Sequence, residues 1–349
     1  MWTEVELPTS WGVMRGKRWG SGPQKLLGVH GWLDNANTFD RILPLLTCDC
    51  TFVSLDLPGH GKSDHFSQGF IYDPRGYVGA IKKSVEALGW NKFHFVGHSM
   101  GAVVGIIYCS VFKEDVESFV SIDIIKPWSF KPQDYAPKLL QYFQSYFDNE
   151  KKSTLPPLVY QKEELISKTI SGSGNSLDAS AASLLLERGA VPSKDGSGFL
   201  LTRDLRAKTY FIGFFSFEAW LAMAESITCP ILIIKADDGH GYESAEKYAE
   251  MRQAFERNCS LYRYYTLPGT HHVHLLHPSP IASFVNAFFE DLLKVECDEV
   301  KCINGASLET NSCAYLTNDA SQVVKTVSTP SQSSDGDECS KEKSICDED

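Results

Sequence analysis

The sequence lacks an excess of basic residues and a long apolar run, and we expect no leader of the secretory type. Its 349 residues carry a formal net charge of −11, which argues against nucleic acid as a partner. No stretch approaches the roughly 18 consecutive apolar residues of a membrane span, and the first residues contain neither a basic nor an apolar segment. We therefore expect a cytoplasmic protein without a transmembrane segment.

Metal and phosphate signatures are also missing. Ten cysteines are present, but none belongs to a Cys-x-x-Cys or Cys/His pattern with zinc spacing, and we expect reduced thiols. The largest group of histidines, His271, His272, His274 and His277, lies in one loop, where we expect no carboxylate beside them. We therefore predict no metal and no cofactor. One residue separates Gly59 from Gly61-Lys62-Ser63, whereas a phosphate-binding loop needs four.

Short apolar runs alternate with amphipathic stretches over most of the chain. This alternation predicts an α/β fold with a mostly parallel sheet covered by helices on both faces. An antiparallel hairpin over 2–7 and 13–19 would form one edge. The runs that predict further strands are 26–29, 52–55, 93–96, 119–122, 231–234 and 261–266, and those that predict helices are 73–88, 100–112, 244–257 and 280–295.

Two segments depart from this alternation. Residues 126–226 are rich in aromatic residues, leucine and charge but show no strand pattern, which indicates a helical cap above the carboxyl ends of the strands. Residues 296–349 are polar and carry a net charge of −8, which predicts a disordered acidic tail. The predicted organisation is a core of 1–125 and 227–295, a cap of 126–226 and a tail of 296–349.

The pentapeptide Gly97-His98-Ser99-Met100-Gly101 lies between a predicted strand and a predicted helix. In this context the pattern is typical of a nucleophile elbow, a sharp turn that exposes the serine hydroxyl at the sheet edge. The turn leaves little room for the side chains two positions before and after the serine, and Gly97 and Gly101 have none.

A serine hydroxyl needs a base before it can act as a nucleophile. The loop after the last predicted strand contains His271, His272, His274 and His277. His271 directly follows the turn residues, so we expect it to reach Ser99, with His272 pointing away and the other two capping or packing. This reasoning does not decide which carboxylate orients His271. Asp123 ends one predicted strand and the pair Asp237 and Asp238 ends another, at the same edge of the sheet.

Acyl transfer also requires donors for the tetrahedral oxyanion. The backbone N–H after the nucleophile, that of Met100, is one candidate. The other is the N–H of Trp32, in the loop after strand 26–29, where Gly31 allows the backbone to turn and His30 supports the turn.

Four motifs in this order resemble the α/β-hydrolase superfamily: His30-Gly31-Trp32, Asp56-x-Pro58-Gly59-His60-Gly61-x-Ser63, Gly97-His98-Ser99-Met100-Gly101 and Gly269-x-His271. The residues within these motifs resemble those of the serine hydrolase-like, kraken-type protein family. This resemblance implies an eight-stranded, mostly parallel sheet with a helical cap. It also favours Asp123 as the acid, because the usual glycine before Asp238 is missing and related small esterases place an acid where Asp123 stands.

The sequence therefore predicts a serine hydrolase that cleaves a carboxylic ester, or a thioester or amide, through an acyl-enzyme. A small-molecule substrate with a hydrophobic acyl group would suit the aromatic-rich cap. The alternatives are an inactive binding protein of the same fold, and a lyase or perhydrolase that uses the same triad. The sequence indicates no oligomeric state.

Overall fold

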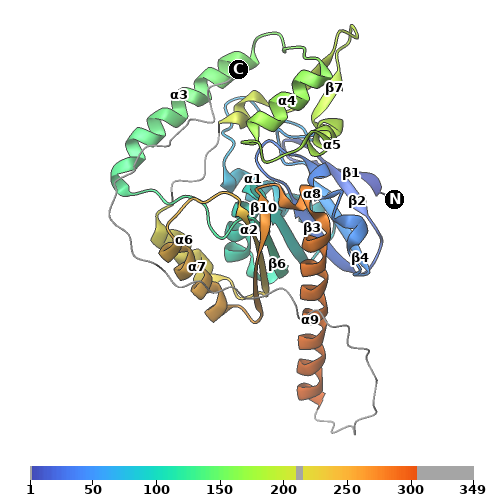
Figure 1. Ribbon diagram of the computed structural model, residues 1–349, viewed down its shortest axis with the longest axis vertical. Helices are drawn as coiled ribbons and strands as arrows, with labels where there is room; N and C mark the ends of the chain where they lie inside the picture. The colour runs from blue at the N-terminus through green and yellow to red at the C-terminus, as the bar shows by residue number, and fades with distance from the viewer. Residues whose placement is uncertain (1, 210–214, 305–349) are drawn as a thin grey trace. The chain divides into compact units, whose positions relative to one another are not determined.

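The computed structural model describes residues 2–209 and 215–304, with side chains to Lys294. Its centre is an eight-stranded sheet (Figure 1). β1 pairs antiparallel with β2, β2 pairs antiparallel with β4, and all other pairs are parallel. This confirms the predicted sheet and its edge hairpin. Across the sheet the strands are β1 Trp2–Thr9, β2 Gly12–Trp19, β4 Cys50–Leu55, β3 Gln24–Val29, β5 Phe93–His98, β6 Val116–Ile122, β9 Ile231–Asp238 and β10 Tyr262–Thr270.

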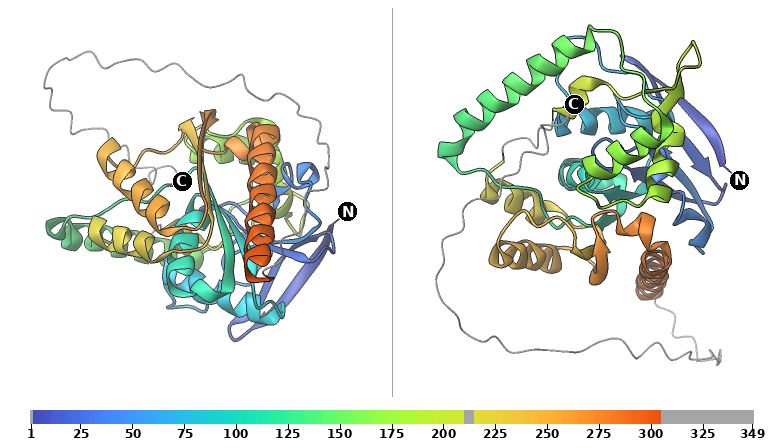
Figure 2. Two further views of the ribbon diagram at one scale, coloured as in Figure 1. Left: turned by 90° about the horizontal axis from the view of Figure 1, so that it is seen from below. Right: turned by 45° about the horizontal axis from the view of Figure 1, so that its top comes forward.

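Helices cover both faces because neighbouring residues of each buried strand point to opposite sides. Leu27 and Phe95 belong to the apolar cluster formed with α1 Pro74–Ala87, α2 Met100–Val111, α6 Phe217–Ser226 and α7 Ala245–Asn258. Leu26 and Val96 belong to the cluster on the other face, formed with α9 Pro278–Asn304 up to Leu292. The left view of Figure 2 shows α6 and α7 on one side of the sheet and α9 on the other.

Local signals explain where several helices begin. Asp73 accepts hydrogen bonds from the N–H groups of Arg75 and Gly76, and Pro74 occupies the first turn of α1. Ser244 caps α7 in the same way through the N–H of Lys247. Such caps satisfy N–H groups that have no partner within the helix.

The insertion above the sheet is helical, as its composition predicts, but it also contains a small hairpin. We expected no strand in 126–226, and this is wrong for β7 Ala190–Pro192 and β8 Phe199–Leu201. Three-residue strands are too short to produce a recognisable alternation. The helices here are α3 Tyr135–Ser153, α4 Lys162–Gly172, α5 Ala179–Gly189 and α6, whose Trp220 is fully buried in the cluster shared with α2 and α7.

Shorter elements complete the description. The 3-10 helices are η1 Ala36–Phe39, η2 Leu43–Leu45, η3 Lys113–Asp115, η4 Pro132–Asp134 and η5 Leu205–Lys208, and α8 spans Val273–Leu276. We expected the last helix to end at 295, but α9 continues to Asn304. The rest of the predicted tail, 305–349, lies outside the described residues. Within the described part of the chain, no helix has both the length and the apolar character needed to span a membrane.

Candidate active site

Ser99 occupies the junction between β5 and α2, at the carboxyl end of a central strand. Its φ of 51° lies in the left-handed region, a strained conformation for a residue with a side chain. A Cβ on Gly97 would lie 2.7 Å from the backbone of Ala102, and one on Gly101 would lie 2.0 Å from the carbonyl oxygen of Val29. The predicted close approach at both glycines is therefore present.

His271 follows the last residue of β10 and reaches Ser99. The two side chains are hydrogen-bonded, with 2.7 Å between His271 Nε2 and Ser99 Oγ. On its other side His271 Nδ1 lies 2.5 Å from Asp123 Oδ2. A carboxylate can only accept a hydrogen bond, so Nδ1 carries the proton. Nε2 is therefore unprotonated, and its lone pair accepts the hydrogen bond from the Ser99 hydroxyl.

Asp123 ends β6 with a φ of 60° and is held by several donors. Its Oδ1 accepts from the ammonium of Lys235 at 2.5 Å and from the N–H of Ala236 at 2.9 Å, and its Oδ2 accepts from the N–H of His240 at 3.2 Å. A Cβ on Gly239 would lie 2.2 Å from Oδ1. The loop after β9 can therefore enclose this carboxylate only with glycine at position 239.

The structure distinguishes Asp123 from the two alternative acids. Asp237 and Asp238 are exposed, and Asp238 is paired with Thr270 in the sheet register, whereas Asp123 is fully buried against His271. No hydrogen bond joins Asp238 to His271 among the described residues. Asp123, the preferred candidate, is the one placed at the histidine.

Burial shapes the electrostatics of this chain of groups. It lowers the pKa of His271 well below the ordinary 6.5, and the rings of His98 and His240 lower it further. Burial also raises the pKa of Asp123 above its ordinary value, although Lys235 opposes this shift. A neutral imidazole is the form that accepts a proton from serine.

The two candidate oxyanion donors lie on adjoining segments. Met100 is the first residue of α2, and Trp32 lies in the loop after β3, which touches the elbow where Gly101 packs on Val29. His30 holds this loop in place, because its Nδ1 donates to the Gly31 carbonyl at 2.7 Å and its Nε2 accepts from the Leu57 N–H at 3.0 Å.

Sequence reasoning missed two residues that support Asp123 and His271. Lys235 lies on β9, the parallel neighbour of β6, directly after the predicted strand 231–234. His240 packs its ring against His271 with 3.9 Å between centroids. The adjacency of β6 and β9, which the sequence does not reveal, is the signal that would have identified both.

We expected no carboxylate beside the histidines, and this is wrong. Asp34 Oδ2 lies 3.5 Å from His98 Nδ1 and 3.4 Å from His272 Nε2. His272 places its Nδ1 at 2.6 Å from Ser176 Oγ, and His274 packs in the interior with its Nε2 at 2.8 Å from Thr38 Oγ1. Asp34 comes from the loop after β3, so only the parallel strand order brings it to the histidine loop.

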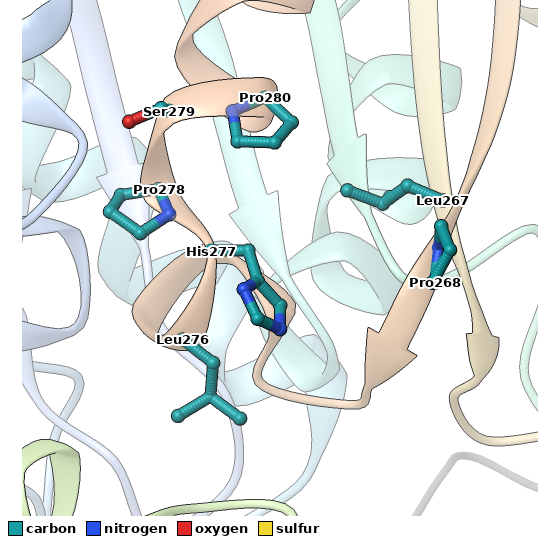
Figure 3. A pocket seen from close by; sticks show the side chains of 7 residues that line it. All are labelled: Leu267, Pro268, Leu276, His277, Pro278, Ser279 and Pro280. Carbon is teal, nitrogen blue, oxygen red and sulfur yellow. The ribbon is translucent and has the colours of Figure 1, made fainter. Parts of the chain in front are cut away.

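Two hollows lie near these segments. The larger, of about 500 Å³, is formed where β10 ends and α9 begins (Figure 3), and none of its lining residues belongs to the Ser99, His271 and Asp123 chain. The smaller, of about 30 Å³, lies between the loop after β3 and the cap. It is lined by Leu33, Asp34, Asn35, Gly61, Thr169, Leu185, Leu186, Gly189, Leu201, Thr202 and Arg203.

The sheet order, the elbow serine and the histidine that follows the last strand define one class of protein, the α/β hydrolases. The sequence matches the family model described as alpha/beta hydrolase fold over residues 26–278. The crystal structure of a hypothetical protein from Pseudomonas aeruginosa PAO1 is similar, with a TM-score of 0.73 and 27% identity, covering 82% of this chain and 99% of that one.

Two curated relatives narrow the class. The chain is 32% identical to a "Probable serine hydrolase" of Drosophila melanogaster, over 83% of this chain and 88% of that protein. It is also 32% identical to the human "Serine hydrolase-like protein 2", over 82% of this chain and 94% of that protein. The chain belongs to the α/β-hydrolase fold family and, within it, to the serine hydrolase-like proteins.

Proposed function

We propose that this protein is a serine esterase that cleaves a small carboxylic ester through a covalent acyl-enzyme. The observation that carries the proposal is the hydrogen-bonded chain from Ser99 through His271 to Asp123, with all three side chains buried. A buried serine whose hydroxyl donates to a neutral imidazole, itself oriented by a carboxylate, is the arrangement that activates serine as a nucleophile.

The proposed reaction uses each group in turn. Ser99 Oγ attacks the ester carbonyl carbon as His271 Nε2 takes its proton, and Asp123 stabilises the imidazolium that forms. The N–H groups of Met100 and Trp32 would hold the oxyanion. His271 then returns the proton to the leaving alcohol, and a water molecule deprotonated by His271 hydrolyses the acyl-enzyme.

A hydrophobic acyl group would suit the apolar side chains that the core and the cap contribute where they meet. Leu33, Leu185, Leu186 and Leu201 line the cavity between them, whose volume of about 30 Å³ is too small for an acyl chain, so the cap would have to shift to admit one. Apolar walls favour an aliphatic or aromatic acyl chain over a charged one. A panel of esters, thioesters and amides with graded acyl length would test this, and a preference for acetyl or charged acyl groups would contradict it.

A fluorophosphonate probe tests the nucleophile directly. We expect stoichiometric labelling of the folded protein, because the probe reacts with activated serines, and no labelling of Ser99→Ala. Labelling that persists in Ser99→Ala would move the reaction to another residue. An unlabelled wild-type protein would favour the alternative of an inactive binding protein.

Matched carboxylate variants test the third member of the triad. Asp123→Asn should reduce kcat by about 10³- to 10⁴-fold, because asparagine neither orients the imidazole in the productive tautomer nor stabilises its charged form. Asp238→Asn, an exposed change at the alternative position, should alter kcat less than about twofold. The reverse order of effects would assign the role to Asp238.

A further inference from the structure

Behind the catalytic histidine, three electron-pair donors from three segments converge. They are His98 at the end of β5, His272 in the loop after β10 and Asp34 in the loop after β3. Their facing atoms all lie within 4.8 Å of one another. All three side chains are at least nine-tenths buried, with exposures of 0% for His98, 6% for Asp34 and 6% for His272.

Hydrogen bonding on the far side of each ring determines which nitrogen faces the cluster as a lone pair. His98 Nε2 lies 3.0 Å from the His271 carbonyl oxygen, which can only accept, so Nε2 carries the proton. Ser176 Oγ donates its single proton to the Ser173 carbonyl at 2.8 Å. It must therefore accept from His272 Nδ1, 2.6 Å away. In their neutral forms, both rings turn an unprotonated nitrogen toward Asp34.

Asp34 Oδ2 forms no hydrogen bond with either ring. The separations of 3.4 and 3.5 Å to the two rings are longer than the 2.7–2.9 Å or so of charge-assisted hydrogen bonds. Among the described residues, Asp34 Oδ2 and His98 Nδ1 have no hydrogen-bond partner, which is costly for buried polar atoms.

The two separations from Asp34 to the histidines match the spacing of ligands around a small cation, and the two histidine nitrogens lie within 4.8 Å of each other. Ligand atoms bound tetrahedrally to Zn²⁺ at about 2.0–2.1 Å stand about 3.3 Å apart. A Cβ on Gly31 would lie 2.9 Å from both Asp34 Oδ2 and His98 Nδ1, so the glycine leaves open the space beside these two atoms. Asp34 also lines the cavity of about 30 Å³ under the cap, which has room for a water molecule.

The geometry points to a buried binding site for a divalent transition-metal ion such as Zn²⁺, formed by Asp34 Oδ2, His98 Nδ1 and His272 Nε2. A water molecule would complete the coordination. Two imidazoles and one carboxylate suit Zn²⁺ better than Mg²⁺ or Ca²⁺, which prefer oxygen ligands. Each histidine already donates its other N–H to an oxygen, the supporting contact that metal-bound histidines make.

The ion would lie behind the active site and would take no part in the chemistry. The His271 ring lies 4.8 Å from that of His98 and 5.2 Å from that of His272, centroid to centroid.

Calorimetric titration of the full chain with Zn²⁺ tests the site without depending on activity. Reactive thiols are first alkylated with iodoacetamide, because cysteines also bind Zn²⁺. We expect one equivalent to bind with micromolar affinity or better. Asp34→Asn and His272→Gln should each weaken this binding more than tenfold, while the matched control His271→Gln should retain it.

A Co²⁺ titration gives an independent readout, because tetrahedral Co²⁺ has intense visible absorption. The wild type and His271→Gln should develop this absorption, and Asp34→Asn and His272→Gln should not. Thermal unfolding without metal identifies a variant that fails to fold, and the other variant then decides the outcome.

Absence of saturable binding in the wild type would overturn the site in favour of a simple His272–Asp34 ion pair. Equal binding by wild type and both ligand variants would overturn it as well. Loss of binding only in His271→Gln would place the metal on the triad histidine instead.

Discussion

At the scale of single residues, the candidate active site depends on how closely groups from different segments approach one another. Ser99 and Asp123 both have positive φ, which places their side chains at the carboxyl ends of neighbouring strands. His271 closes the chain between them with bonds of 2.7 and 2.5 Å. Small changes in the surrounding loops should therefore have large effects on activity.

Gly239 tests this dependence. Gly239→Ala would place a Cβ 2.2 Å from Asp123 Oδ1, so the carboxylate or its loop must shift, and kcat should fall by about 10²-fold or more. Gly241→Ala in the same loop is the control, since a Cβ there meets nothing within 4 Å. Equal kcat values for both variants would show that the site tolerates displacement of Asp123.

The pH dependence of hydrolysis should reflect the environment of His271. Burial and the neighbouring rings lower its pKa well below 6.5, and the base is active only when neutral. The value of kcat/KM should therefore stay constant as the pH falls through 6.5 and decline only at lower pH. Measurement of kcat/KM between about pH 4 and pH 8 checks this. A decline centred at or above 6.5 would contradict the proposed environment.

At the scale of elements, helix α5 attaches the cap to the sheet through one buried arginine. Arg188 Nε donates to Asp56 Oδ2 at 2.6 Å, and its terminal nitrogens donate to the two Glu4 carboxylate oxygens at 2.9 and 3.0 Å. Arg188 and Asp56 have side-chain exposures of 2% and 0%. A buried cation is costly unless it is paired, and here β1 and the loop after β4 provide the partners.

Arg188→Ala should destabilise the protein by about 3–5 kcal/mol, because it leaves Asp56 buried without its cationic partner. Arg257→Ala is the matched control, since its 3.6 Å pair with Glu225 is about half exposed and such pairs contribute about 0–1 kcal/mol. Urea unfolding of both variants measures the difference. Equal losses would show that the Arg188 pairs contribute little to stability.

At the scale of the whole molecule, the buried apolar surface ends before the acidic segment begins. Within the described part of the chain, the last buried apolar side chain of α9 is Leu292. From Glu296 onward the sequence carries a net charge of −8, a composition that cannot supply a hydrophobic core.

A chain that ends at Val295 should therefore retain the Tm and the kcat/KM of the full-length protein. A chain that ends at Pro280 should not fold, because it loses the residues of α9 that pack on the sheet, among them Val285 and Phe288. Thermal unfolding and ester hydrolysis measure both outcomes. Loss of folding or activity on removal of residues 296–349 alone would show that this segment stabilises the core.

The sequence by itself determined the alternation of strands and helices, the elbow at Ser99 and the choice of His271, because these follow from periodicity and from short motifs along the chain. The short hairpin of β7 and β8 escaped detection because three residues show no period. Only the tertiary structure decided between Asp123 and Asp238, because strand order determines which carboxylate faces the histidine. The same strand order brings Asp34 to His98 and His272, a contact between segments distant in the sequence that no local pattern encodes.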